Sequence, residues 1–186
     1  MLLALFLIPV KTFTRYEIID EMRYNIIDDY AVLASNTDWK YTGNIVVPQK
    51  VTASDGKKYP VTALEEGCFR DCKTVTSVLL PSSITKIGEY CFCGCIHLQR
   101  VNIPSSVTSL GKSTFSGCSS LTEIHLPRHL TSLGYACFAR CCSIKNIELP
   151  PYVEYLGKFC FSGCTSLESI TIPSSVTCIE DQCFYG

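Results

Sequence analysis

The residues most able to carry chemistry in this sequence are its cysteines. The segment CFCGC places three of them between Cys91 and Cys95, and the chain of 186 residues contains 13 in all. Such a cluster is typical of a metal clip, a redox site or a disulfide network. The spacing C-x3-C falls within the range used by zinc ligands, so its interpretation depends on whether it is local or recurs along the chain.

Two other patterns match catalytic or metal-binding motifs. Ser83 and Lys86 fit the S-x-x-K spacing of an acyl-enzyme nucleophile, but no partner motif accompanies them. His125 and His129 are four residues apart, but Pro127 prevents one helix from presenting both to a metal. The chain has no glycine-rich phosphate loop and no G-x-S-x-G segment. We therefore expect no enzyme, with no catalytic residue, cofactor or metal ligand.

The overall composition indicates a folded, nearly neutral chain. Hydrophobic residues make up 47% and charged residues 18%, and 16 basic residues nearly balance 17 acidic ones. This balance argues against a nucleic-acid partner. Residues 1–13 are strongly apolar, and we interpret them as the remnant of a secretion signal, with a first core strand as the alternative. No apolar run is long enough to predict a membrane span.

The chain repeats with a period of 23 residues, which predicts a solenoid of stacked units. The full repeats can be aligned without gaps, and each carries a phenylalanine and a cysteine at fixed positions. The predicted units are a degenerate first repeat 45–77, full repeats 78–100, 101–123, 124–146 and 147–169, and a truncated repeat 170–186, together the domain 45–186.

Each unit can be interpreted physically. Its start, such as 124–126, alternates apolar and polar residues and ends at a proline, which predicts a short strand buried on one side. A second extended piece follows, as in 107–110, and Gly111 then allows a tight bend. The next segment, KSTFSGC, has the length of one helical turn with Phe115 as its buried anchor. Stacked units bury these apolar faces in a continuous core.

The motif I-x-[IL]-P-x-x-V-x-x-[IL]-G-x-x-x-F-x-x-C-x-x-L resembles the BspA-like leucine-rich repeats, over residues 45–186. The resemblance implies an α/β-type solenoid: a right-handed superhelix with short strands on one face and an N-terminal β-hairpin cap, placed at 14–44. Within and after that cap, residues 16–36 suggest two strands around a turn, and Asp55-Gly56 predicts a hairpin. The resemblance also implies a secreted or cell-surface protein linked to adhesion to host matrix proteins and other cells.

The repeat register assigns most cysteines a packing role, because buried thiols behave as small hydrophobes. Cys68, Cys91, Cys137, Cys160 and Cys183 share one position, at which Thr114 stands in the remaining unit. Metal ligands are disfavoured because each unit supplies too few, while disulfides between adjacent units remain open. Three cysteines lie off both positions and are expected to be exposed: Cys93, Cys142 and Cys178. The motif position itself forms the expected structural ladder of Cys72, Cys95, Cys118, Cys141 and Cys164.

The outward residues of the predicted strands should align into a band that can bind another macromolecule. The candidate binding face consists of Arg100, Asn102, Glu123, His125, Asn146, Glu148, Ser169 and Thr171. A merely solvated sheet face is the competing interpretation. Several tyrosines in the post-proline half of the units suggest a second contact face: Tyr90, Tyr135, Tyr152 and Tyr155.

We thus expect a non-catalytic protein-binding module whose partner is an extracellular matrix or cell-surface protein. A structural spacer, or the substrate-binding arm of a larger surface protein or enzyme, is the alternative. The last unit stops at Gly186, before its motif cysteine, so we expect a fragment that self-associates through an uncapped C-terminal repeat.

Overall fold

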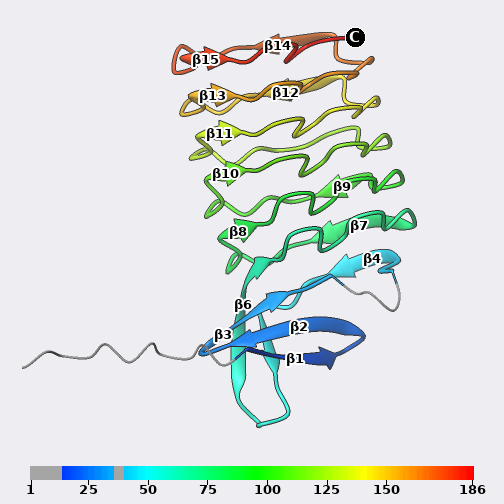
Figure 1. Ribbon diagram of the computed structural model, residues 1–186, viewed down its shortest axis with the longest axis vertical. Coiled ribbons are helices and arrows are strands. Elements are labelled where there is room, and N and C mark those ends of the chain that lie inside the picture. Colours follow the sequence, from blue (N-terminus) through cyan, green and yellow to red (C-terminus); the bar gives the residue numbers. More distant parts are fainter. Residues whose placement is uncertain (1–13, 36–39) are drawn as a thin grey trace, which may run out of the picture.

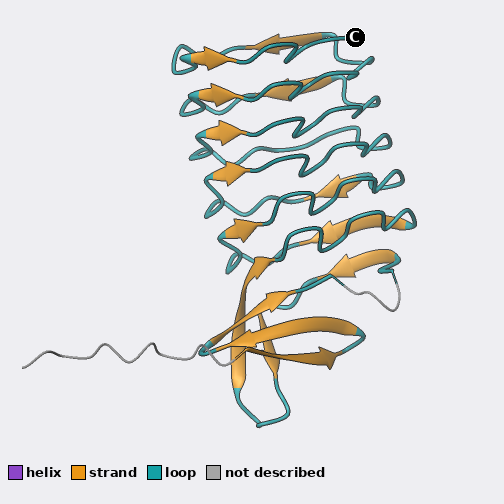
Figure 2. Ribbon diagram, viewed as in Figure 1, coloured by secondary structure: helices purple, strands orange, loops and turns teal. Residues whose placement is uncertain are grey.

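The computed structural model describes residues 14–35 and 40–186, so the predicted signal remnant at residues 1–13 lies outside the described residues. The described chain is a stack of similar turns standing on a β-rich base (Figure 1). Each turn of the stack, which we call a rung, corresponds to one 23-residue unit. Strands and loops account for all of it, and the described residues contain no helix (Figure 2).

The base begins with an antiparallel meander of three strands, β1 (Thr14–Ile19), β2 (Met22–Ile27) and β3 (Tyr30–Leu33). Tight turns join the strands, with positive φ at Asp20, Glu21 and Asp28. The sequence predicted only two strands here. The second turn was missed because aspartate supplies its left-handed residue in place of the glycine that usually marks such a turn.

A hairpin joins this base to the stack. Strands β5 (Lys50–Thr52) and β6 (Lys58–Leu64) are antiparallel, which confirms the turn predicted at Asp55-Gly56. Strand β6 also pairs in parallel with β3 on one side and with β8 (Lys86–Ile87) on the other. One sheet therefore runs from the base into the first rung.

The rungs contribute two columns of short parallel strands, not strands on one face alone as expected. The first column follows the unit starts, and the second follows the extended piece after each proline, so equivalent residues pair 23 apart along most of it. The first column contains β4 (Gly43–Val46), β7 (Val75–Leu79), β9 (Arg100–Val101), β12 (Asn146–Glu148) and β14 (Ser169–Thr171). The second continues above β8 with β10 (Ser109–Leu110), β11 (Ser132–Leu133), β13 (Tyr155–Leu156) and β15 (Cys178–Ile179).

The third side of each rung is a turn segment, and the predicted helical turn there is wrong. Two residues in every unit are left-handed, for example Tyr90 with φ 55° and Gly94 with φ 76°. They leave only three residues between them, too few for a helix. Every second N–H of this segment bonds to the next rung instead, as that of Phe69 does to the Cys91 carbonyl at 2.8 Å.

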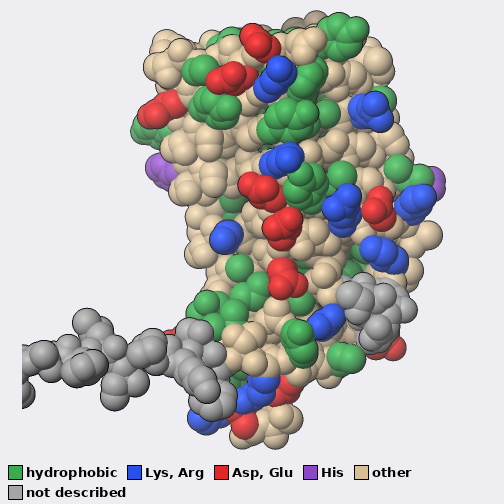
Figure 3. All heavy atoms as spheres, in the orientation of Figure 1, with side chains coloured by type: hydrophobic (Ala, Val, Ile, Leu, Met, Phe, Trp, Pro, Cys, Tyr) green, Lys and Arg blue, Asp and Glu red, His purple; other side chains and the backbone are tan. Residues whose placement is uncertain are grey.

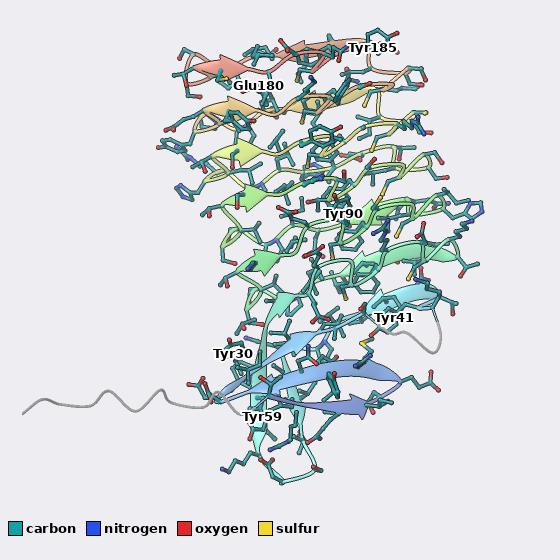
Figure 4. The ribbon with its side chains drawn as sticks, in the orientation of Figure 1. Tyr30, Tyr41, Tyr59, Tyr90, Glu180 and Tyr185 are labelled. Atoms are coloured by element: carbon teal, nitrogen blue, oxygen red, sulfur yellow. The ribbon has the colours of Figure 1, made fainter. Side chains whose placement is uncertain are left out.

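The core is a column of phenylalanines between these three sides. Successive rings from Phe69 to Phe184 stack with centroids 5.1–5.6 Å apart and nearly parallel planes. Tyr41, from the base, packs against Phe69 at 5.1 Å and closes the column at that end (Figure 4). Such pairs contribute about 0.5–1.5 kcal/mol each beyond the burial of their area.

The glycine that recurs in the four full units has a different role from the predicted bend. Gly134 and Gly157 have ordinary φ, but a Cβ on either would lie within 2.8 Å of backbone atoms of the rung below. These glycines therefore allow adjacent rungs to approach closely. At the equivalent glycine Gly111, an added Cβ would contact only the Glu89 side chain, at 3.0 Å.

Candidate functional site

The cysteines form no metal or disulfide site among the described residues. All thirteen are free thiols, and the described part of the chain contains no group of three or more potential ligands placed to hold a metal ion. Ten are buried, including all members of the predicted ladder. Burial raises the pKa of the Cys118 and Cys141 thiols well above 9, so they stay protonated and unreactive at neutral pH.

The ladder cysteines do more than fill space. The thiol of Cys118 donates to the carbonyl of Phe92 in the rung below at 3.2 Å, and Cys141 donates to Phe115 at the same distance. Cys95 and Cys164 repeat the contact at 3.0 and 3.1 Å. The motif cysteine thus links neighbouring rungs, a role the sequence did not reveal because the acceptor lies 26 residues away.

The three cysteines outside the ladders are half-buried, not exposed as expected. The Cys142 thiol contacts the carbonyls of Arg140 and Gly163 at 3.4 and 3.5 Å, and Cys178 contacts a Glu180 carboxylate oxygen at 3.5 Å. Partial burial raises the pKa of Cys93. None of these surroundings activates a thiolate.

The eight residues of the candidate binding face are all exposed, and five of them lie in strands of the first column. They are not equally free to bind. Asn102 uses its side chain to accept from the N–H of Leu80 at 2.7 Å and to donate to the Leu80 carbonyl at 2.8 Å. The Nε2 of His125 lies 3.2 Å from the Oε1 of Glu123. Asn102 therefore serves the stacking of rungs as well as the surface.

Sequence reasoning missed the apolar part of this face. Val46 and Leu79 stand at the same outward position in the two rungs nearest the base, and their exposed fractions are 61% and 56%. Their register, one step after a buried strand residue, was the signal that could have identified them. Next to them, Thr76 and Ser77 donate to the Asn44 side chain, which orders the polar edge of this patch.

The first strand column is interrupted in its middle. Residues 122–126, which we call the open rung, form no strand, and the column divides into a three-stranded sheet ending at β9 and a two-stranded sheet beginning at β12. Among the described residues, no hydrogen-bond partner is found for any main-chain N–H or C=O of the open rung. Unpaired peptide groups of this kind must be satisfied by water or by another partner.

A groove of about 730 Å³ lies between the open rung and the rung above it. We call it the rung groove. Half-buried Leu126 and buried Ile124 line it from the open rung, and Pro150 and Pro151 line the opposite rung. The charged residues at its edges have both signs. The charged lining residues are Glu123, Arg128, Lys145 and Glu148, with His125 beside them.

A second gap lies in the second strand column, between β8 and β10. It forms a hollow of about 610 Å³ lined by Glu65, Glu66, Lys86 and Glu89 among others. There, each rung remains paired on its other side, β8 with β6 and β10 with β11. Only the open rung lacks pairing at both of its edges among the residues described.

The predicted second contact face lies partly on the turn side. Tyr90 lies between Arg70 and Lys112, whose cationic groups are 5.3 and 5.4 Å from its ring (Figure 4). Lys112 also approaches the exposed ring of Tyr135 at 5.5 Å. Tyr152 stacks on His129 at 5.6 Å, away from this row. These aromatic groups therefore form a cation–π row and a separate pair, not a single patch.

Surface charge provides no strong field toward a partner. In Figure 3 acidic and basic side chains are interspersed over the visible face, between small apolar areas. The nearly equal counts of basic and acidic residues agree with this distribution. No helix in the described ranges has the length and apolarity needed to cross a membrane.

The repeats match the model of the BspA type leucine rich repeat region, with six copies over residues 60–186. The chain belongs to this family. Leucine-rich repeats generally mediate protein interactions, and repeat domains of this family are generally non-catalytic. No sequence among the curated proteins matches the chain.

Solved bacterial structures resemble the fold. A leucine-rich repeat protein from Bacteroides ovatus is 34% identical with a TM-score of 0.77, over 86% of this chain and 42% of that protein. The T. pallidum leucine rich repeat protein is 27% identical with a TM-score of 0.70, over 87% and 69%. A leucine rich cell surface protein from Faecalibacterium prausnitzii is 24% identical with a TM-score of 0.58, over 88% and 55%. The chain thus spans about two fifths of the Bacteroides ovatus protein.

Proposed function

We propose that the chain is a non-catalytic protein-binding module of a secreted or cell-surface protein, which contacts extracellular matrix or the surface of other cells. The observation that carries this proposal is the first strand column, where outward side chains of successive rungs form one exposed band. Solenoids use such extended faces to bind macromolecules. A surface location is supported by the similarity to the Faecalibacterium prausnitzii cell surface protein.

The chemistry of the band suits a protein partner. Val46 and Leu79 provide an exposed apolar area at one end, and the remaining positions provide charges, amides and hydroxyls. Interfaces between proteins likewise combine apolar area with polar groups, although here the apolar part lies at one end of the band. The mixture of signs gives no preference for a polyanion, which disfavours nucleic acid as a partner.

Binding assays with charge-reversal variants test the proposal. The purified chain is measured by interferometry against a panel of purified extracellular-matrix and cell-surface proteins. Arg100→Glu combined with Glu148→Arg changes the band, while Arg140→Glu combined with Glu154→Arg changes exposed residues elsewhere at the same net charge. We expect at least a tenfold loss of affinity for the first pair alone. Equal affinities for both pairs would contradict the proposal, and so would the absence of any binding partner in the panel.

A further inference from the structure

Strand β1 forms an edge of the base sheet, and its outer side has no partner among the described residues. It pairs only with β2, and the pairing runs without a bulge. Figure 1 shows β1 at the end of the base that lies away from the stack. Natural edge strands are usually protected by lysine, proline or a bulge. β1 contains neither lysine nor proline, so its edge is available for pairing with another strand.

The main-chain groups on this edge can be assigned from the partner strand. The carbonyl of Arg23 accepts from the N–H of Ala34 at 2.9 Å, so the main-chain groups of Arg23 point toward β3. These groups alternate in direction along an antiparallel strand, so those of Tyr24 point toward β1 at its partner residue Glu17. By the same alternation, three residues of β1 direct their N–H and C=O groups away from the sheet: Thr14, Tyr16 and Ile18.

The side chains beside the edge are apolar on one face and charged on the other. Tyr16 and Ile18 are 63% and 60% exposed on the outer face. Arg15 and Glu17 lie on the opposite face, where Glu17 accepts from the N–H of Ser54 at 2.7 Å. This contact with the hairpin turn uses a side chain of β1, so it leaves the main-chain edge unpaired.

A second copy of the chain fits this edge in one symmetric register. When two antiparallel β1 strands are centred on Tyr16, their outward main-chain groups meet in hydrogen-bonded pairs. The same register places Arg15 of each copy opposite Glu17 of the other, so opposite charges face each other. Centring on Glu17 or on Arg15 would place like charges opposite each other, which is destabilising. Centring on Ile18 would pair fewer residues.

We propose that two copies of the chain associate through β1, whose strands pair antiparallel about Tyr16 and join the two base sheets into one. The interface is short, so the association belongs to the weak class that buries less than about 1,200 Å². This inference goes beyond the proposed binding function. The two stacks extend away from the shared sheet, so a dimer presents two bands to a multivalent surface.

Sedimentation over a concentration series, combined with amide hydrogen exchange, tests the proposal on the whole chain. We expect the mass to rise from one subunit toward two between about 10 µM and 1 mM. The amides of Tyr16 and Ile18 should gain protection as the dimer forms, because dimerisation pairs their N–H groups. A chain that is still monomeric at about 1 mM, or a dimer in which these amides gain no protection, overturns the inference.

A matched pair of variants separates main-chain pairing from side-chain contact. Tyr16→Pro and Tyr16→Ala both remove the ring, but only proline also removes the outward N–H. Proline is tolerated in an edge strand where its nitrogen faces solvent, so we expect both variants to fold. The dissociation constant of the dimer should be at least tenfold higher for the proline variant than for the alanine variant. Equal constants overturn main-chain pairing.

An introduced cysteine tests the register and also decides the question if the proline variant does not fold. In the register centred on Tyr16, the Cα atoms of the two copies of residue 16 lie about 5.5 Å apart, within the range for a disulfide. Ile18→Cys is the control, because residue 18 faces Thr14 of the other copy. With oxidised glutathione, we expect crosslinked dimers of Tyr16→Cys alone, above the wild-type level set by the native thiols. Equal crosslinking of both variants, or crosslinking of neither, overturns the register.

A variant at the other end of the molecule distinguishes this dimer from association through the last repeat. Tyr185 is 66% exposed on the C-terminal rung, and we expect Tyr185→Glu to dimerise like the wild type. If Tyr185→Glu abolishes association and Tyr16→Pro does not, the inference is wrong. The charge reversals at Arg100 and Glu148 should leave dimerisation unchanged, so failure of the proposed function and failure of this inference are separate results.

Discussion

Gly157 and Gly111 occupy equivalent positions in two rungs, and the structure predicts opposite outcomes for the same substitution. A Cβ on Gly157 would lie 2.5 Å from the carbonyl carbon of Gly134 and 2.7 Å from the N of Tyr135. Both contacts are with backbone, so the rungs must move apart and strain their paired strands. A Cβ on Gly111 would meet the Cγ of Glu89 at 3.0 Å, in an exposed side chain that can rotate away.

The magnitudes follow from two opposing effects. Overpacking a well-packed contact costs about 1–3 kcal/mol, and Gly157 belongs at the upper end because neither neighbour can rotate away. Glycine to alanine at an ordinary φ gains about 0.4–1 kcal/mol through the unfolded chain. We therefore expect Gly157→Ala to lose about 2 kcal/mol of unfolding free energy. Gly111→Ala should change it by less than about 1 kcal/mol in either direction.

Urea unfolding followed by far-ultraviolet circular dichroism measures both variants against the wild type. Where the unfolding free energy of variant and wild type falls with the same slope in urea, the urea midpoints give the difference in unfolding free energy directly. Because a solenoid can open rung by rung, amide exchange in the two rungs next to each substitution serves as a local control. Equal losses for the two variants would refute the argument that rung spacing at Gly157 is limited by backbone contact.

Three further predictions concern the turn side and the thiols. Arg140 is left-handed at φ 59°, where Gly117 stands one unit earlier, so Arg140→Gly should raise the unfolding free energy by up to about 1 kcal/mol in urea titrations. Cys141→Ala removes a buried thiol bonded to Phe115 and should cost about 1–2 kcal/mol, whereas Cys142→Ala, at a half-buried thiol, should cost less than about 0.5 kcal/mol. Burial raises the pKa of the Cys141 thiol in the folded state above its value in the unfolded chain. The contribution of this thiol to the unfolding free energy is therefore complete below pH about 9, and it declines above that pH by up to about 1.4 kcal/mol per pH unit. Urea midpoints measured from pH 7 to 10 should therefore fall at the alkaline end, and a flat profile would contradict this.

The stacked architecture could be predicted from the sequence because every unit carries the same buried positions. Phe92, Phe115 and Phe138 recur 23 residues apart, and a column is the arrangement that buries all of them. The alternation around Ile147 likewise predicted a strand, which the structure confirms as β12. The repeat period and the apolar–polar alternation indicate which residues are buried, and burial between stacked units determines the fold of a repeat protein.

The turn side was predicted incorrectly because spacing alone cannot distinguish a helical turn from a left-handed one. Gly94 and Gly117 indicate one of the two positive φ values, but Tyr90 and Ser113 conceal the other. In those residues the hydrogen bonds to the next rung stabilise a backbone conformation that the side chains themselves disfavour.

The open rung could not be predicted from its local pattern. Residues 124–126 alternate apolar and polar side chains just as 147–149 do, yet only the second segment is paired. Pairing depends on the distance between neighbouring rungs, which arises from packing contacts along the whole stack. The candidate face was thus predictable as a band of exposed residues, whereas the groove that divides it became visible only in three dimensions.

The most direct test of this account is residue-resolved amide exchange of the free chain at neutral pH. The account predicts that amides of residues 122–126 exchange rapidly, as unpaired groups in contact with water do, while paired amides of β9 and β12 on either side are protected at least a hundredfold. If the open rung is protected as strongly as its neighbours, the strand column is continuous in solution and the account of an interrupted column is wrong.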